Sequence, residues 1–309
     1  MIIDIADLSV IFLSYDEPKK DEFWLRVKNI APWAKRVDGV KGSDTAHKAA
    51  ACISDTERFI LIDGDNLPDE NFFTMQLDFT DKDESYANAQ YRWRARNIIN
   101  GLQYGNGGIS SWTKTYVMNM RTHENSDGNS KNTVDFCLDS NDNLYWSMHD
   151  CYSTTYPNGS KFQAWRAGFR EGVKMCLNRG IKPSITDFQY AIANRNLNNL
   201  TVWHNVGADV DNGLWAMYGA RYGTYLTMLT SWDYTKVQSF DAIEKIFNEC
   251  VKEDIVNELI KYGEILKSKL KLPICMLNSE QSEFFKLNYN PDRVNMGILI
   301  REMDIIFKK

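Results

Sequence analysis

Residues 58–66 read RFILIDGDN, and this stretch carries the strongest structural signal in the chain. The run from Phe59 to Ile62 is apolar and partly β-branched, which is typical of a buried strand. Asp63, Gly64 and Asp65 follow it directly. An Asp-Gly pair is also a common hairpin turn, but the following LPDENFF indicates the start of a helix rather than a returning strand. We therefore predict a strand that delivers two carboxylates to one edge of a sheet.

The chain before this strand alternates between strand and helix patterns. The apolar run at 8–13 and the short segment 34–37 (AKRV) indicate strands, whereas apolar residues at helical spacing over 21–30 and a further segment at 45–53 indicate helices. Such alternation predicts an α/β fold with a mostly parallel, Rossmann-like sheet that is covered on both faces.

The alternation decays after residue 77, and helical patterns return later in the chain. We expect helices at 160–179, 211–230, 240–266 and 294–307. A boundary near residue 236 then separates a catalytic domain, 1–235, from a C-terminal helical segment, 236–309.

Composition excludes several protein classes. The 309 residues are 43% hydrophobic and 25% charged, unlike a disordered, collagen-like or disulfide-scaffold protein. The net charge of −5 argues against a surface built as a whole to hold nucleic acid. None of the six cysteines forms a CxxC or CxC pair, so the spacing indicates neither a zinc knuckle nor a thioredoxin-type redox site. We expect a reducing compartment.

The N-terminal sequence gives no targeting signal that we recognise. Its apolar stretch is interrupted by Asp4 and Asp7 and has no basic leader, unlike a signal peptide. No run approaches the roughly 18 apolar residues of a membrane-spanning helix. We expect a soluble, cytoplasmic protein that has no membrane partner, located in the host cytoplasm if a phage encodes it.

The two carboxylates of the DGD sequence suggest a metal site. Asp63 and Asp65 would repel each other without a cation, and Mg²⁺ and Mn²⁺ use carboxylate and phosphate oxygens together. Gly64 would allow a ligand to approach the backbone closely. A calcium EF-hand loop is excluded because Leu67 and Thr74 occupy two ligand positions. A phosphatase with an aspartyl nucleophile remains a chemical rival.

The order of these parts resembles nucleotide-sugar glycosyltransferases of the GT-A fold, in the group that includes family-2 transferases. The resemblance rests on an opening strand and loop, VIFLSYDEP at 10–18, on a loop and helix, GVKGSDTAHKAAA at 39–51, and on the DGD motif. The blocks YDEP, PWAKRV and QAWRAGFREG are similar in particular to transferases of tailed bacteriophages, some of which modify hydroxymethylated pyrimidines of phage DNA.

The resemblance implies roles for many residues of the nucleotide-sugar site. It implies that the loop after the opening strand lies near the base and ribose, that the loop and helix after it approach the diphosphate or uracil, and that the glycines after the DGD motif lie beneath the donor sugar. Asp65 would be the principal Mn²⁺ or Mg²⁺ ligand, and Asp63 would face the metal or the ribose. The nucleotide-sugar-binding residues expected in this way are Ser14, Tyr15, Asp16, Glu17, Lys41, His47, Lys48, Asp63, Gly64, Gly107 and Gly108.

The resemblance also suggests a base and a third metal ligand. Inverting transfer needs a carboxylate that deprotonates the acceptor hydroxyl. The family places it after the glycine loop, where this chain has VDFC, so Asp135 is the first choice. Asp150 and Asp209 remain alternatives. For the metal, His204 fits the position of a late histidine ligand, and His149 is its alternative.

Charge is concentrated in two stretches that bear on the acceptor. Residues 85–121 hold five basic and no acidic side chains, and residues 151–182 hold six basic and one acidic. Cations interleaved with aromatic rings can contact phosphates and stack on an unpaired base, although solvated helix faces and diphosphate sites produce similar clusters. The acceptor-binding residues expected on this basis are Trp93, Arg94, Trp112 and Arg166.

Together these features predict a metal-dependent, inverting hexosyl- or pentosyltransferase. It would move a sugar from a UDP-sugar to the hydroxymethyl group of a pyrimidine, such as hydroxymethylcytosine, in phage DNA. One alternative keeps the chemistry but uses a glycan, protein or small-molecule acceptor. Another is a non-catalytic module that binds a sugar nucleotide or nucleic acid.

Overall fold

A computed structural model describes residues 1–105, 108–122, 145–250 and 254–291, which form two compact units. The first unit contains the described residues of 1–97 and 103–156, and the second contains 98–102 and those from 157 onward. This division differs from the boundary expected near 236. The helices after residue 157 share one hydrophobic core with the C-terminal helices, and side chains such as Trp165 and Leu259 belong to the same cluster.

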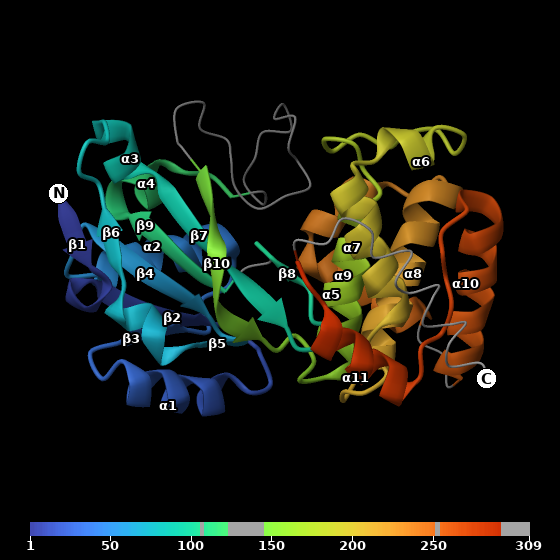
Figure 1. Cartoon of the computed structure of the whole chain (residues 1–309), viewed down its shortest axis with the longest axis horizontal. Coiled ribbons are helices and arrows are strands. Elements are labelled where there is room, and N and C mark those ends of the chain that lie inside the picture. Colours follow the sequence, from blue (N-terminus) through green and yellow to red (C-terminus); the bar gives the residue numbers. More distant parts are fainter. Residues whose placement is uncertain (106–107, 123–144, 251–253, 292–309) are drawn as a thin grey trace. The chain divides into compact units, whose positions relative to one another are not determined.

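The first unit is built on an eight-stranded sheet (Figure 1). Its order is β3-β2-β4-β9-β7-β10-β5, and β8 pairs with β7 beside this path. A separate antiparallel pair joins β1 and β6. The strands are β1 (Ile2–Asp4), β2 (Ser9–Ser14), β3 (Lys35–Asp38), β4 (Arg58–Asp63), β5 (Asn66–Pro68), β6 (Gln76–Asp78), β7 (Gln90–Asn97), β8 (Gln103–Tyr104), β9 (Ile109–Thr113) and β10 (Tyr145–Thr155).

The sheet is mixed, so the expected α/β class is confirmed, whereas the mostly parallel, Rossmann-like arrangement is not. Strand β2 runs parallel to β3 and β4, and β7 runs parallel to β10. The other pairings, β4 with β9, β9 with β7, β7 with β8 and β10 with β5, are antiparallel. The parallel part coincides with the stretch where strands and helices alternate in sequence. Past that stretch the described residues between β7 and β9 contain no crossover helix, and β9 lies antiparallel to both of its neighbours, β4 and β7.

Both faces of this sheet are covered, as the alternation predicted. Along β4, Ile60 and Ile62 belong to a core with Phe72, whereas Phe59 and Leu61 belong to another core on the opposite face. A strand buried on both faces is apolar at every position, which explains the continuous run in the sequence. The helices of this unit are α1 (Lys20–Ile30), α2 (Ser43–Ile53), α3 (Glu84–Asn88) and α4 (Lys114–Asn119), with 3-10 turns η1 (Ile5–Asp7) and η2 (Glu70–Thr74).

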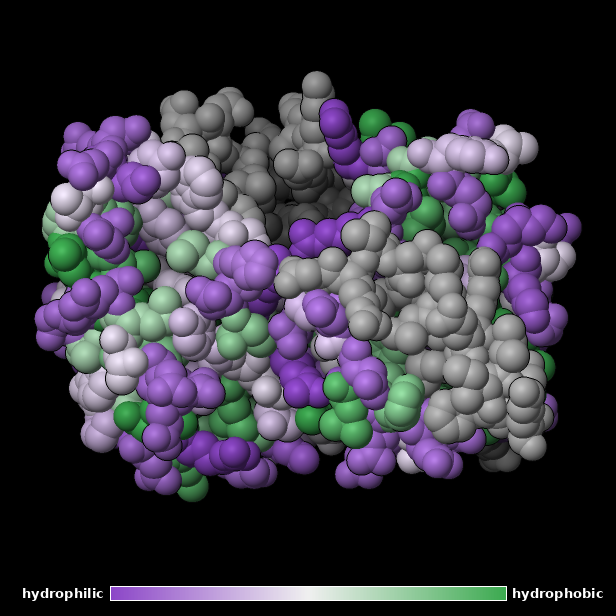
Figure 2. Space-filling model, in the orientation of Figure 1, coloured by the Kyte–Doolittle hydropathy of each residue, from purple (hydrophilic) through white to green (hydrophobic). Residues whose placement is uncertain are grey.

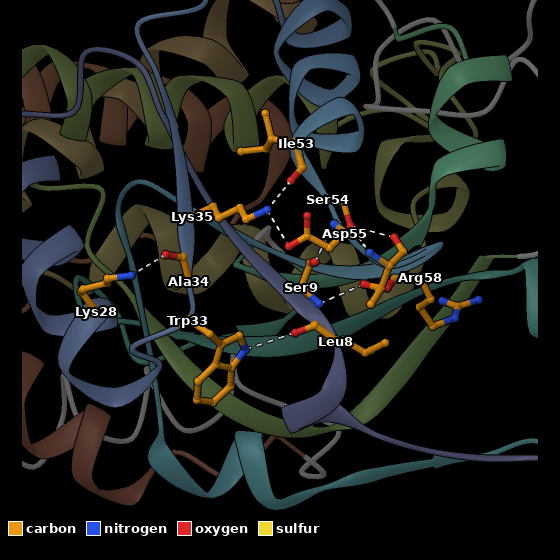
Figure 3. Close-up of polar contacts among 11 residues, drawn as sticks. Leu8, Ser9, Lys28, Trp33, Ala34, Lys35, Ile53, Ser54, Asp55 and Arg58 are labelled. Atoms are coloured by element: carbon orange, nitrogen blue, oxygen red, sulfur yellow. Dashed lines mark hydrogen bonds and ion pairs between the residues drawn. The ribbon is translucent and has the colours of Figure 1, made fainter.

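Polar contacts secure the edge of the sheet at which β2 and β4 begin (Figure 3). The Lys35 Nζ donates to the carbonyl of Ile53 at 3.0 Å and to the carboxylate of Asp55 at 2.6 Å. The Ser9 N–H donates to the Thr56 hydroxyl at 2.9 Å, and the Asp55 N–H donates to the Ser9 hydroxyl at 2.9 Å. These bonds anchor the connection from α2 to the start of β4. The DGD turn follows the opposite end of β4.

The second unit is helical. Its helices are α5 (Lys161–Lys174), α6 (Phe188–Ala191), α7 (Asn194–Asn205), α8 (Gly213–Leu229), α9 (Phe240–Cys250), α10 (Ile255–Leu270) and α11 (Ser279–Asn288), with the 3-10 turn η4 (Tyr234–Gln238). The helices predicted at 160–179 and 211–230 are confirmed, with shorter bounds. The stretch 240–266 contains two helices rather than one long helix, and the helix predicted at 294–307 lies outside the described residues.

Helices α5 and α8 cross closely because glycines face each other at the crossing. A Cβ on Gly219 would overlap the carbonyl oxygen of Trp165, and a Cβ on Gly168 would overlap the carbonyl oxygen of Ala216. The backbones therefore touch where side chains would otherwise separate them.

A buried arginine joins the surrounding helices to this crossing. Arg221 of α8 is 1% exposed. Its guanidinium donates to the carbonyl oxygens of His204 at 3.0 and 2.7 Å, Leu259 at 2.6 Å and Cys275 at 2.8 Å. These bonds satisfy acceptors on three separate segments, α7, α10 and the chain before α11.

The described helices bury their apolar residues within the units. The longest of them, α8, has 17 residues and packs against α5, α7 and α10. None of the described helices combines the length and hydrophobicity that crossing a bilayer requires. On the face shown in Figure 2, hydrophilic and hydrophobic residues are interspersed over the described surface of each unit.

Candidate functional site

The candidate site lies at the carboxyl end of β4, in the first unit. Asp63 is the last residue of β4, and its N–H donates to the carbonyl of Gly108 at 3.1 Å. In return the Gly108 N–H donates to the Asp63 carboxylate at 3.1 Å. The glycine-bearing segment before β9 thus continues the antiparallel ladder beside the DGD turn, so two motifs 45 residues apart form one site.

The Asp63 carboxyl group has an unusual environment. Burial raises its pKa from 3.8 to about 6, with the nearby Glu17 carboxylate adding to the effect and the Arg92 guanidinium opposing it. A carboxylate in this setting is stabilised when positive charge comes close. Perturbed acids of this kind are typical of functional sites.

The loop after β2 lies directly against the DGD turn. A Cβ on Gly64 would lie 2.6 Å from the Glu17 carboxylate and 2.9 Å from the Ser14 Cβ, so any larger residue would have to displace the loop after β2 or the Glu17 side chain. Glu17 also accepts a 2.7 Å hydrogen bond from the backbone N–H of Tyr15. The structure therefore brings Ser14, Tyr15 and Glu17 together with Asp63, as the order of motifs suggested, while Asp16 is exposed in the same loop.

Asp65 ties the same turn to β10. Its backbone carbonyl accepts a 2.7 Å hydrogen bond from the Tyr156 N–H, and its carboxylate accepts a longer one, 3.4 Å, from the Thr155 hydroxyl. The side chain is half-buried. Asp63 and Asp65 are thus held on either side of Gly64 by different neighbouring strands.

Gly108 and Asn66 meet beneath this turn. Gly108 has φ +139°, in the region that favours glycine, and a Cβ there would overlap the Asn66 amide. Asn66 is fully buried, and neither polar atom of its amide has a hydrogen-bond partner among the described residues. Asn66 was not among the residues predicted for the site, although it directly follows the DGD motif.

A carboxylate that was not predicted for the site, Asp38, belongs to the same edge of the sheet. Asp38, at the end of β3, accepts hydrogen bonds from the Ser14 hydroxyl at 2.7 Å and from Lys20 at 2.8 Å, and it lies 3.3 Å from Arg36. Burial acts to raise the pKa of Asp38, but the bonds from Lys20 and Ser14 and the charge of Arg36 lower it overall. Its sequence signal was an aspartate followed by glycine at the end of a strand, the pattern seen after β4.

The basic residues expected near the diphosphate lie on or just before α2. The Nδ1 of His47 lies 2.8 Å from the Ser43 carbonyl, and the ring packs edge-on against Trp112. Lys48 forms a 2.7 Å ion pair with Asp44. Lys41 is exposed in the loop before the helix.

The structure does not support His204 as a metal ligand. The residue belongs to the second unit, where it is fully buried and its Nε2 lies 3.0 Å from the Thr224 hydroxyl. Burial and the nearby Arg221 lower the pKa of His204 to about 3, so the imidazole is neutral. His149 is exposed on β10. Among the described residues, no group of three or more His, Cys, Asp or Glu side chains could hold a metal ion.

Two of the expected acceptor-binding residues are core residues. Trp93 and Trp112 are both 0% exposed, and the Trp112 indole donates to the Ser110 hydroxyl at 2.6 Å. Neither ring has a face on which a base could stack, so this expectation is corrected. Burial of aromatic rings on a covered sheet explains the pattern instead. Arg94 is half-buried on β7, and Arg166 of the second unit lies over the Phe240 ring at 4.8 Å.

The candidate bases lie in different places. Asp135 lies outside the described residues, as does Gly107, which was expected to bind the nucleotide sugar. Asp150 is exposed on β10, whereas Asp209 forms an ion pair with Lys286 inside the second unit. Asp150 is therefore the described alternative that shares a unit with the DGD turn.

Comparisons with protein-family models and with curated proteins give no match to this chain.

Proposed function

We propose that the chain is a metal-dependent glycosyltransferase and that its first unit has a GT-A-like arrangement. The observation that carries this proposal is the meeting of three motifs at one sheet edge. The loop after β2, the DGD turn after β4 and the glycine before β9 contact one another through Glu17, Asp63 and Gly108. A mixed sheet that is parallel over β3, β2 and β4 is compatible with such a fold.

The donor set fits a divalent cation that is shared with a substrate. Asp63 and Asp65 supply two carboxylates, and Mg²⁺ is commonly held by one or two carboxylates together with substrate phosphates. The raised pKa of Asp63 means that the site favours added positive charge. When bound, the cation would neutralise charge that develops on a nucleoside diphosphate leaving group.

The chain's own residues would orient the donor. Glu17 and Asp38 present carboxylate acceptors at the ends of β2 and β3, where base and ribose N–H and O–H groups could bind. Gly108 brings bare backbone to the DGD turn and leaves room for the transferred ring. A carboxylate base would remove the acceptor proton, with Asp135 as first candidate and Asp150 as the alternative.

We further propose that the donor is a UDP-sugar and that the acceptor is a hydroxymethyl pyrimidine in DNA. The support is the motif resemblance together with the basic side chains of β7 beside Asp63. Arg92 lies close enough to Asp63 to lower its pKa.

Mass spectrometry of nucleosides tests this function. Hydroxymethylated DNA would be incubated with the protein, Mn²⁺ or Mg²⁺ and a panel of UDP-sugars. A hexose or pentose adduct is expected with the wild type and not with Asp65→Asn. Asp55→Asn is the matched control, because Asp55 lies at the opposite end of β4 and pairs with Lys35. An Asp65→Asn protein with undiminished transfer would refute the metal assignment.

The same preparation separates the alternatives. UDP release without a DNA adduct would favour another acceptor, and binding of UDP-sugar without hydrolysis or transfer would favour a non-catalytic module. Phosphate release from a phosphomonoester would favour the aspartyl phosphatase chemistry instead.

A further inference from the structure

Three arginines form a row along one face of β7. Side chains alternate between the faces of a strand, so Arg92, Arg94 and Arg96 share a face. The residues between them point the other way, because Tyr91 and Trp93 belong to the core that also contains Ile60 and Ile62. The arginine row therefore stands on the opposite face.

The row lies on the same face as Asp63 and reaches the same sheet edge. Arg92 is opposite Ser110 of β9, and Ser110 is opposite Leu61 of β4. Two residues further along β4, on the same face, comes Asp63. The influence of Arg92 on the Asp63 pKa is consistent with this register. Because β7 and β4 both run antiparallel to β9, the row continues from Arg92 toward the edge that carries the DGD turn.

The neighbouring strand β10 runs parallel to β7 beside the arginine row. Arg92, Arg94 and Arg96 are opposite Ser147, Cys151 and Thr154, respectively. The charges of Arg96 and Arg94 act on the Cys151 thiol, which places both guanidinium groups near it.

The arginines remain accessible on this face. Arg92 and Arg94 are half-buried, and Arg96 is exposed. The buried Nε of Arg94 has no hydrogen-bond partner among the described residues. A partly desolvated guanidinium of this kind favours a phosphate or carboxylate partner.

We infer that this arginine row binds the phosphate backbone of the DNA acceptor and leads it to the DGD turn. The inference rests on the proposed function for the identity of the acceptor. Residues 92 to 96 span roughly 13 Å at about 3.3 Å per residue. Two phosphates joined by one bridging oxygen cannot extend along such a row, whereas the successive phosphates of a nucleic-acid strand can. The row thus explains how a chain with net charge −5 could hold a polyanion locally.

Fluorescence anisotropy with a labelled, unmodified DNA duplex tests the inference, without donor or metal. We expect Arg94→Gln/Arg96→Gln to weaken binding and to reduce the slope of log K against log salt by about 1.8, for two lost phosphate contacts. Arg94→Lys/Arg96→Lys keeps the charges and should retain most of the slope. Arg26→Gln is the matched control, because Arg26 is an exposed arginine of α1 that pairs only weakly with Glu22, at 3.9 Å.

Each outcome supports or overturns the inference. A wild type that does not bind DNA, or an Arg94→Gln/Arg96→Gln protein with unchanged affinity and slope, would overturn it. The inference would also be overturned if the Arg94→Gln/Arg96→Gln protein bound DNA normally but lacked the rise in Tm that we expect UDP and Mn²⁺ to produce in the wild type. The arginines would then bind the nucleotide rather than DNA. Failure of the glycosyltransferase proposal appears separately, as absence of any adduct while the salt-dependent DNA binding persists. Should the double glutamine variant not fold, comparing wild type with Arg96→Gln, whose side chain is exposed, gives the same test with a slope change of about 0.9.

Discussion

Replacing Asp63 by asparagine should stabilise the fold while it removes function. The pKa of Asp63 is raised from 3.8 to about 6, which is about two units, and each unit corresponds to roughly 1.4 kcal/mol. Ionised Asp63 therefore destabilises the folded state by about 3 kcal/mol. Asparagine removes the charge and keeps a carbonyl oxygen that can accept the Gly108 N–H. We expect Asp63→Asn to raise the free energy of unfolding by about 2 to 3 kcal/mol near pH 8.

The pH dependence gives the sign of this effect. The folded pKa lies above the unfolded value, so the destabilisation is complete above about pH 7 and disappears below about pH 3, where the carboxyl is protonated in both states. Groups that do not interact with Asp63 titrate alike in both proteins and cancel in the difference, whereas Glu17 and Arg92 are coupled to it. Urea unfolding of wild type and Asp63→Asn, with a chelator present, should therefore show a difference in free energy that is large near pH 8 and much smaller near pH 4.

Asp38→Asn is the control of opposite sign. The pKa of Asp38 is lowered, so its ionised form stabilises the fold above its unfolded pKa, and this contribution is lost as the pH falls. The substitution should destabilise the protein near neutral pH. The reasoning about Asp63 is refuted if Asp63→Asn is less stable than wild type near pH 8, or if the difference does not change with pH.

Three further substitutions test the second unit and the metal proposal. Gly219→Ala places a Cβ against the carbonyl oxygen of Trp165 and should lower the free energy of unfolding by about 1 to 3 kcal/mol. Urea unfolding measures this change. An unchanged value would show that α5 and α8 can move apart at no cost. Arg221→Met leaves buried carbonyl oxygens, including that of His204, without a donor, at a cost of about 1 to 3 kcal/mol each. We therefore expect the free energy of unfolding to fall by more than about 3 kcal/mol, or the protein not to fold. Near-wild-type stability would contradict this. Asp65→Asn should abolish the rise in Tm that Mn²⁺ with UDP produces in the wild type, and a retained rise would exclude Asp65 as a ligand.

The buried strands of the first unit could be predicted because their composition reflects local burial. The runs at 8–13 and 58–62 are apolar at nearly every position, and the structure shows β2 and β4 buried on both faces. The turn after β4 was equally visible, since Gly64 between two aspartates is a local pattern. The close approach of Glu17 gives this glycine its physical reason.

The direction of β9 and the fate of the aromatic residues could not be predicted in this way. An antiparallel neighbour leaves little trace in a strand of five residues such as Ile109–Thr113. Trp93 and Trp112 alternate with polar residues, a pattern that fits both a binding surface and a covered sheet. Only their packing places them in the core.

Local sequence therefore specified β2, β3 and β4, the DGD turn and the helical character of the second half, because hydrophobic period and glycine placement act over a few residues. Tertiary packing determined which distant groups share an environment. It paired Asp63 with Gly108, placed His204 in the core of the second unit, and put Arg92 on the same sheet face as Asp63 across β9. Burial and charge proximity, which set the pKa of Asp63, depend on these long-range neighbours and so arise only in the folded chain.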